Sequence, residues 1–126
     1  MAELYVDQVM SRPAETVAPD TPVRETADHL IRNDVGAVVV VDDAGRLEGI
    51  LTATDFVRMF GDGTASPDAS VAEFMRTEVV TTTRGTLASE VAATMVDRLI
   101  HHVPVVEGEE VVGMVTTLDL AAHLAP

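Results

Sequence analysis

The chain contains the same succession of short motifs twice, and this duplication restricts its fold more than any single motif does. Matching segments recur at an offset of 64 or 65 residues, with small gaps in the loops. In chain order, the matched pairs are residues 9–10 with 74–75, 21–23 with 85–87, 37–42 with 102–107, and 49–55 with 113–119. Because four pairs keep one order, the chain is predicted to contain one structural unit twice.

The first repeat predicts the order β-α-β-β-α. Its valine run at residues 36–41 is short and β-branched, which favours a buried strand over a helix. Thr21 is expected to be the N-cap of a helix with Pro22 at its first position. The face of this helix predicted to be buried carries Val23, Ala27, Leu30 and Ile31. The other expected elements are a strand at 15–17, a turn at 42–45, a strand at 47–51 and a closing helix through Phe56, Val57 and Phe60.

The second repeat predicts the same order. Its expected elements are a strand near 79–81, a helix with Leu87, Val91, Met95 and Leu99, strands at 103–106 and 111–115, and a closing helix. Each unit is then a three-stranded sheet with two helices on one face, which gives an α+β (α/β-like) fold. A piece of about 60 residues buries little surface alone. The repeats, at 1–60 and 70–126, are therefore expected to pack sheet to sheet about a pseudo-twofold axis.

The segment between the repeats, residues 61–69, is rich in turn formers and is predicted to be a linker. Directly after it, Ser70 and Glu73 form the pattern of a capping box that opens a short helix. The same pattern, a hydroxyl residue followed three positions later by an acid, occurs in Thr52 with Asp55 and in Thr116 with Asp119. Taken alone, each of these pairs is a capping motif.

The charge balance narrows the classes of partner. Asp and Glu number 21 against 8 basic residues, all of them arginine, for a formal net charge of −13. A field of that sign repels nucleic acid and anionic membranes. An acidic chain without lysine also favours a salt-loaded cytoplasm, where dense carboxylates stay hydrated, although a GC-rich genome would likewise replace lysine by arginine.

Several kinds of site and location are excluded or disfavoured by the sequence. Because the chain has no cysteine, it has no disulfide, thiol nucleophile or cysteine-ligated metal. Its longest internal apolar run is far below the ~20 residues that span a membrane, and its N-terminus has no signal pattern, so a cytoplasmic location is expected. No Walker-type glycine loop and no Gly-x-Ser-x-Gly elbow is present.

Position raises the functional interest of Asp55 and Asp119. Both lie where a predicted strand runs into a helix N-terminus, the end of an α/β sheet at which ligands gather. An ionised aspartate has about four lone-pair sites, so it can accept one backbone N–H and still accept from two hydroxyls. A ribose diol supplies two such donors, and the helix dipole keeps the carboxylate charged.

Across nearly its whole length the chain resembles a tandem pair of CBS domains, the cystathionine-β-synthase type of regulatory module. The motifs that carry the resemblance are residues 7–10, 17–23, 49–55, 101–105 and 113–119. The resemblance implies a cleft between the repeats that binds an adenosine-containing ligand. It implies that Asp55 and Asp119 bind the ribose, with Thr52 and Thr116 beside them. The adenine is expected against Val17 or its counterpart near Thr81, and against Ile50 or Met114.

The two repeats differ in the basic residues that they offer to the phosphate end of the implied ligand. His101 and His102 precede the central strand of the second repeat, where similar domains often place a His-Arg pair that meets phosphates. Gly36 and Ala37 stand there in the first repeat, which predicts unequal sites. Thr54 is assigned to the phosphate end as well. The arginines that would compensate, if they face the cleft, are Arg12, Arg76 and Arg84.

The leading interpretation is a non-enzymatic sensor that binds AMP, ADP, ATP or S-adenosylmethionine and signals occupancy to a separate partner protein. Pairs of this kind tend to form homodimers through their helical faces. A polyphosphate would need a cation such as Mg²⁺ against the negative charge, yet no metal-ligand spacing is visible. The alternative is a structural dimerisation module with a degenerate cleft. An enzyme is disfavoured because the spacing of His29, His101, His102 and His123 matches no metal signature.

Overall fold

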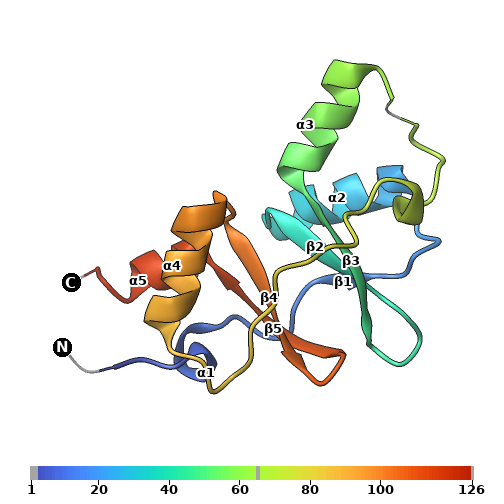
Figure 1. The fold of residues 1–126 in the computed structure, drawn as a ribbon. Coiled ribbons are helices and arrows are strands. Elements are labelled where there is room, and N and C mark those ends of the chain that lie inside the picture. Colours follow the sequence, from blue (N-terminus) through green and yellow to red (C-terminus); the bar gives the residue numbers. More distant parts are fainter. Residues whose placement is uncertain (1–2, 65, 126) are drawn as a thin grey trace. The chain divides into compact units, whose positions relative to one another are not determined.

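The computed structural model describes residues 3–64 and 66–125. The chain divides into two compact units, each described here by itself (Figure 1). The central unit is the continuous stretch 15–78, and the terminal unit combines residues 1–14 with 79–126. Helices and strands mix in both units, and the predicted α+β class is confirmed.

The central unit follows the predicted β-α-β-β-α order. Its elements are β1 (Thr16–Val17), α2 (Val23–Asn33), β2 (Ala37–Val41), β3 (Leu47–Thr52), α3 (Ala53–Asp62) and the 3₁₀ helix η1 (Val71–Glu73). The sheet has the order β1-β2-β3, with β1 parallel and β3 antiparallel to β2. The predicted turn is present: Gly45, at φ 79°, donates its N–H to the Asp42 carbonyl, while the Asp42 carboxylate accepts the N–H of Ala44. The helix α3 extends into the expected linker and ends at Gly63, which has φ 70°. Residue 65 of that linker lies outside the described residues.

The expected start of α2 is wrong in detail. Thr21 does not cap this helix, because its hydroxyl accepts the N–H of Ala18 instead. The first N–H groups of α2 are satisfied from a distant segment: Val23 donates to the Ala69 carbonyl and Arg24 to that of Pro67, at 2.8 and 2.9 Å. A helix N-terminus must find acceptors for such groups, and here the segment after α3 supplies them.

The residues predicted to form the buried faces of the two long helices are buried only in part. Val23 and Leu30 of α2, like Val91 and Met95 of the later helix, are buried. Ile31, expected on the buried face, is 80% exposed, and the fully buried Thr26 packs in its place, donating its hydroxyl to the Pro22 carbonyl.

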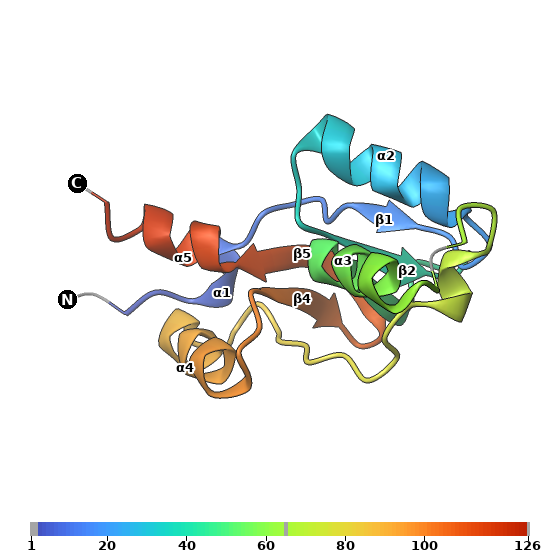
Figure 2. The ribbon, with the colours of Figure 1, turned by 90° about the horizontal axis from the view of Figure 1, so that it is seen from above.

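The terminal unit contains α1 (Val6–Val9), α4 (Ala88–Arg98), β4 (His102–Glu107), β5 (Glu110–Thr116) and α5 (Thr117–Ala122). The two strands form an antiparallel hairpin, and Figure 2 shows α5 continuing from the end of β5. The helix α4 ends at Arg98, so Leu99 is not helical as expected but takes a left-handed conformation with φ 55°. A core of α1, α4, β4 and β5 side chains lies between the hairpin and the helices.

The third strand predicted near residues 79–81 does not form. Only one parallel bridge joins this segment to β4, between Thr82 and Val105, whereas β1 pairs with β2 at two positions. The cause is Pro104. In the central unit the N–H of Val39 donates to the Glu15 carbonyl at 2.9 Å, but the equivalent residue of β4 is Pro104, which has no N–H to donate.

Each unit takes the leading segment of the other repeat. In the terminal unit, Ser11 exchanges two backbone hydrogen bonds with Met114 of β5, at 2.8 and 2.9 Å. In the central unit, Arg76 exchanges two with Ile50 of β3, both at 3.0 Å. The sequence repeat and the packing unit are therefore different divisions of the chain.

The close approach of these segments explains one glycine in each repeat. A Cβ added to Gly49 would lie 2.6 Å from Met75 Sδ and 2.8 Å from the Arg76 carbonyl oxygen. At Gly113 the same atom would lie 2.9 Å from the Ser11 carbonyl oxygen. Only glycine lets the leading segment lie this near to the strand.

Candidate functional site

The end of the last strand in each unit leads directly into the closing helix through a capping box. In α3, Asp55 accepts the Thr52 N–H at 2.8 Å and returns its own N–H to the Thr52 hydroxyl at 3.4 Å. In α5, Asp119 accepts the Thr116 N–H at 2.9 Å and donates to the Thr116 hydroxyl at 3.0 Å. The capping role predicted for both acids is confirmed, and it fixes the orientation of each carboxylate.

Asp55 lies against two arginines. Its side chain is 7% exposed, and its Oδ1 atom is 2.9 Å from both Nε and Nη2 of Arg76. Arg58, one turn further along α3, places Nη1 at 3.5 Å from the same oxygen. The Thr52 hydroxyl also donates to Oδ2 at 3.0 Å. The carboxylate of Asp55 is therefore both buried and neutralised by cations.

Asp119 is set in a different environment. Its Oδ1 atom accepts one hydrogen bond, from the Ser11 hydroxyl at 2.8 Å. Ser11 is neutral, and no arginine reaches this carboxylate among the residues that the structure describes. Asp119 is half-buried and keeps acceptor capacity for a further donor.

Histidines lie at the Asp119 junction, as the motif order predicts. His102 stands opposite Thr116 in the β4–β5 ladder, and the His101 carbonyl accepts the N–H of Thr117 at 3.1 Å. Burial lowers the pKa of His102 and nearby His101 lowers it further, while the charge of Asp119 opposes this shift. The lowered pKa favours the neutral form of His102. In the central unit the equivalent places are Gly36, whose carbonyl accepts from Ala53, and Ala37.

The residues assigned to adenine are divided between the two units. Ile50 and Met114 are 6% and 7% exposed. Because Leu51 and Val115 pack into the helix-covered cores, their neighbours Ile50 and Met114 face the opposite side of each sheet.

The other residues predicted to bind the ligand are Val17, Thr81 and Thr54, and the counterpart of Val17 differs by one residue from the prediction. Val17 packs partly against the central core. Its counterpart in the strand register is Thr82, one residue after Thr81, which is exposed. Thr54 is exposed in the first turn of α3.

Two of the arginines considered for phosphate binding are engaged elsewhere. Arg84 lies 3.1 Å from Asp7 and 2.6 Å from Glu107, and Arg12 lies 3.8 Å from Asp7. Arg76 alone of the three faces a ribose-acid candidate, where it contacts Asp55. Of the basic residues predicted to meet a phosphate, the histidine pair adjoins the Asp119 junction.

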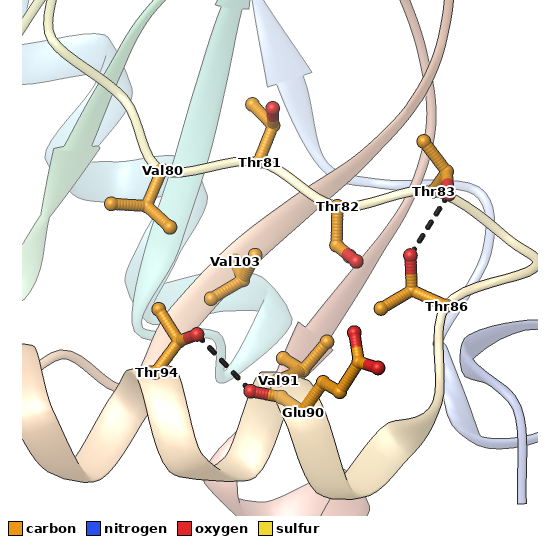
Figure 3. Close-up of a pocket in the computed structure, with 9 residues that line it drawn as sticks. All are labelled: Val80, Thr81, Thr82, Thr83, Thr86, Glu90, Val91, Thr94 and Val103. Atoms are coloured by element: carbon orange, nitrogen blue, oxygen red, sulfur yellow. Dashed lines mark hydrogen bonds between the residues drawn. The ribbon is translucent and has the colours of Figure 1, made fainter.

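A cavity of about 280 Å³ opens in the terminal unit between the 80–83 segment and α4 (Figure 3). Five threonines and Glu90 are among the residues that line it, and Figure 3 shows the Thr82 side chain directed inward. In the central unit, Glu15 and His29 bond at 2.8 Å across the equivalent space, where the terminal unit has Val80 and Thr94. Smaller side chains thus leave the cavity, and it lies on the helix side of the sheet.

Ser11 is a site residue that the sequence did not predict, and the contact of Arg76 with Asp55 was not predicted either. A signal was available: residues 9–10 match residues 74–75, so the next residues, Ser11 and Arg76, are equivalent. Their reach to the acids, however, depends on the register between the leading segment and the strand.

Neither a metal centre nor a membrane span stands out. Within residues 3–64 and 66–125, no group of three or more His, Cys, Asp or Glu side chains is placed to hold a metal ion. His29 pairs with Glu15 in the central unit, and His123 lies at the end of α5. None of the helices in the described ranges is long and apolar enough to cross a membrane.

Comparison with known proteins finds the same duplication. A family model described as "CBS domain" matches residues 6–62 and again residues 71–126. Protein MJ1225 of Methanocaldococcus jannaschii is 27% identical over 95% of this chain and 47% of that protein. Arabinose 5-phosphate isomerase KdsD of Yersinia pestis is 29% identical over 93% of this chain and 36% of that enzyme. The chain thus spans less than half the length of either relative.

Among solved structures, the chain is similar to the CBS domain pair of protein MJ0100, determined in complex with 5'-methylthioadenosine and S-adenosyl-L-methionine. The TM-score is 0.89 and the sequence identity 27%, and the match covers 98% of this chain and 97% of the other. The similarity therefore extends over both repeats.

Proposed function

Since the chain belongs to the CBS-domain family and carries two copies of the domain, we propose that it is a non-catalytic regulatory module that binds an adenosine-containing ligand. The MJ0100 pair, similar over nearly the whole chain, was solved with two such ligands, which supports this ligand class. The proposed ribose-binding acid is Asp119, assisted by Thr116. Asp55 and Thr52 are the corresponding residues of the central unit.

The observation that carries the proposal is the state of the Asp119 carboxylate. Its helix cap and the Ser11 hydroxyl fix it in place but use only part of its capacity to accept hydrogen bonds. A ribose diol would donate its two hydroxyls to the remaining lone pairs. A charged acceptor strengthens such bonds, and its fixed geometry lowers the cost of ordering the site on binding.

The flanking residues suit the rest of an adenosine ligand. Met114, which is 7% exposed, is the proposed apolar contact of the adenine, and the exposed Thr81 offers a hydroxyl for the base. His101 and His102 adjoin Thr116 and Thr117 at the start of α5, and we propose that a phosphate or another 5'-substituent extends toward them. In the central unit Ile50 is the equivalent of Met114, and Val17 and Thr54 are proposed to lie at the base and at the phosphate end of a ligand there.

Charge favours a ligand with few phosphates. The chain has a net charge of −13, and burial lowers the pKa of His102, which disfavours its cationic form. A nucleoside triphosphate would meet repulsion at this site unless a cation such as Mg²⁺ came with it. A neutral or positively charged ligand, such as 5'-methylthioadenosine or S-adenosylmethionine, meets no such barrier, and AMP stands between these extremes.

The proposed output is a change in assembly or in contact with a partner protein. Both units leave large apolar side chains exposed at corresponding places: Ile31 at 80% on α2 corresponds to Val96 at 73% on α4, and Phe60 at 84% on α3 corresponds to Leu124 at 77%, just after α5. A second copy of the chain could cover these faces, as in a homodimer. The alternative function, a dimerisation module with a degenerate cleft, is favoured by the arginine that already holds Asp55.

Calorimetric titration of the protein with 5'-methylthioadenosine, S-adenosylmethionine, AMP and ATP tests the proposal. We expect saturable binding that is lost in Asp119→Ala. A matched control is Glu73→Ala, which removes an acid at the same place of a capping motif, bonded to Ser70 N at 3.2 Å. This control should bind as the wild type does. If no adenosine ligand binds while sedimentation shows a dimer, the dimerisation function replaces the sensor.

A further inference from the structure

Ser11 and Arg76 occupy equivalent positions in the two units but present different side chains to the ribose-acid candidates. Each exchanges two backbone hydrogen bonds with the strand before the closing helix, and each donates from its side chain to Oδ1 of the aspartate. Building on the proposed function, we propose that Arg76 acts as an internal occupant of the Asp55 junction. The chain then binds one adenosine ligand, at Asp119.

Counting acceptors separates the two junctions. A carboxylate offers about four lone-pair sites. At Asp55 the Thr52 N–H and hydroxyl use Oδ2, and the Arg76 Nε and Nη2 groups use Oδ1, so four donors are already present. At Asp119 the donors among the described residues are the Thr116 N–H and the Ser11 hydroxyl, which leaves room for the two hydroxyls of a ribose.

Displacing Arg76 by a ribose would be unfavourable. The guanidinium is charged at every physiological pH, and its bonds to the buried Asp55 are charge-assisted. Neutral hydroxyls would replace these bonds with weaker ones and would leave a cation without its partner. Arg58 adds a second positive group at 3.5 Å from the same oxygen. The asymmetry therefore arises at the ribose acid, in addition to the difference between His101–His102 and Gly36–Ala37.

The backbone of Arg76 keeps its place whatever the side chain is. Its N–H and carbonyl pair with Ile50 at 3.0 Å, as those of Ser11 pair with Met114. Exchanging the two side chains should therefore leave the leading segments docked on their strands. This allows a reciprocal swap in which only the donor at each aspartate changes.

Titration calorimetry with 5'-methylthioadenosine on four proteins tests the inference: wild type, Arg76→Ser, Ser11→Arg and the double swap. The expected stoichiometries per chain are one, two, zero and one. Arg24→Ser is the matched control for losing a cation, because Arg24 pairs only at the surface, 3.7 Å from Asp68. It should keep one site with unchanged affinity. Thermal unfolding of each variant verifies that it is folded before titration.

The outcomes separate the two proposals. Two sites in the wild type, or one site that survives Ser11→Arg, would overturn the role of Arg76 while the ligand-binding function stands. If the folded wild type and Arg76→Ser both bind nothing, the proposed function fails and this inference with it. Binding by Arg76→Ser alone would leave the internal-occupant role of Arg76 standing but refute the open site at Asp119.

Discussion

Val17 and Thr82 hold the same place in the two units, each paired in parallel with the fourth residue of its central strand, Val40 or Val105. Val17 packs against the core of its unit. Thr82 is 9% exposed, and within the described part of the chain its hydroxyl makes no hydrogen bond. One repeat therefore directs a hydroxyl without a partner among the described residues into a cavity, where the other packs a methyl group against its core.

Thr82→Val is accordingly expected to stabilise the protein. Thr82 is 9% exposed and its hydroxyl faces the cavity without a partner in the part of the chain that the structure describes, so part of its hydration is lost. An isosteric methyl group avoids this cost, and the gain should be at most about 1 kcal/mol. Urea unfolding, with the slope of the transition held in common, measures it. The reverse change, Val17→Thr, should destabilise the central unit by about the same amount. Equal stability of all three proteins would show that Thr82 is satisfied in solution.

Gly49→Ala should be strongly destabilising. The added methyl group would collide with Met75 Sδ and the Arg76 carbonyl oxygen, and the backbone oxygen cannot move without breaking the bridge to Ile50. We expect a loss of about 1–3 kcal/mol in chemical unfolding, typical of an overpacked site. Gly61→Ala is the control. Gly61 lies in the helix α3, and a Cβ added there would have no neighbouring atom within 4 Å. That change should be neutral or stabilising by roughly 0.5–1 kcal/mol.

The stability of the fold should fall as the pH is lowered through the range in which free histidine titrates. The pKa of His102 is lowered in the folded protein, so the unfolded chain binds a proton more readily. The stabilisation is fully present above the unfolded pKa of about 6.5 and is lost as pH falls toward the lower folded pKa. Thermal unfolding between pH 7.5 and 5.5 should show a smaller decrease in His102→Gln than in the wild type. An identical decrease in both proteins would contradict this.

Salt should stabilise the folded state. The chain has 21 acidic and 8 basic residues, and folding brings this excess of negative charge into a smaller volume. Screening by salt weakens the repulsion, and the Debye length falls from ~10 Å at 0.1 M to ~3 Å at 1 M. Urea unfolding at increasing potassium chloride should give a rising free energy of unfolding. Full stability in dilute buffer, with no change on adding salt, would refute adaptation to a salt-loaded cytoplasm.

The features predicted correctly from the sequence are those set by neighbouring residues. The turn at Asp42 and the caps at Asp55 and Asp119 each depend on residues two to four positions away. For that reason a short stretch of sequence is enough to predict them. The valine run of β2 is equally clear, because a short β-branched run favours a buried strand, and Val38, Val39 and Val40 are fully buried.

The features that were missed depend on segments far apart in the chain. The first N–H groups of α2 donate to the carbonyls of Pro67 and Ala69, and no local pattern of α2 reveals these acceptors. The contact of Arg76 with Asp55 needs the register of a leading segment on β3. The missing third strand of the terminal unit is an exception, because its cause can be read from the sequence. Pro104 lies in the strand next to it and has no N–H to donate.

The exchange of leading segments determines how this protein can be taken apart. A fragment cut at the boundary between the sequence repeats would lose the strand partner of its own glycine motif, at Gly49 or at Gly113. The stretch 15–78, by contrast, is continuous and contains all the segments of its unit. The terminal unit is made from two stretches far apart in the sequence, with Ser11 and Asp119 bonded across 108 positions. A ligand held by Asp119 would therefore stabilise the segment around Ser11 together with α5, so that occupancy should slow proteolysis in two segments far apart in the sequence.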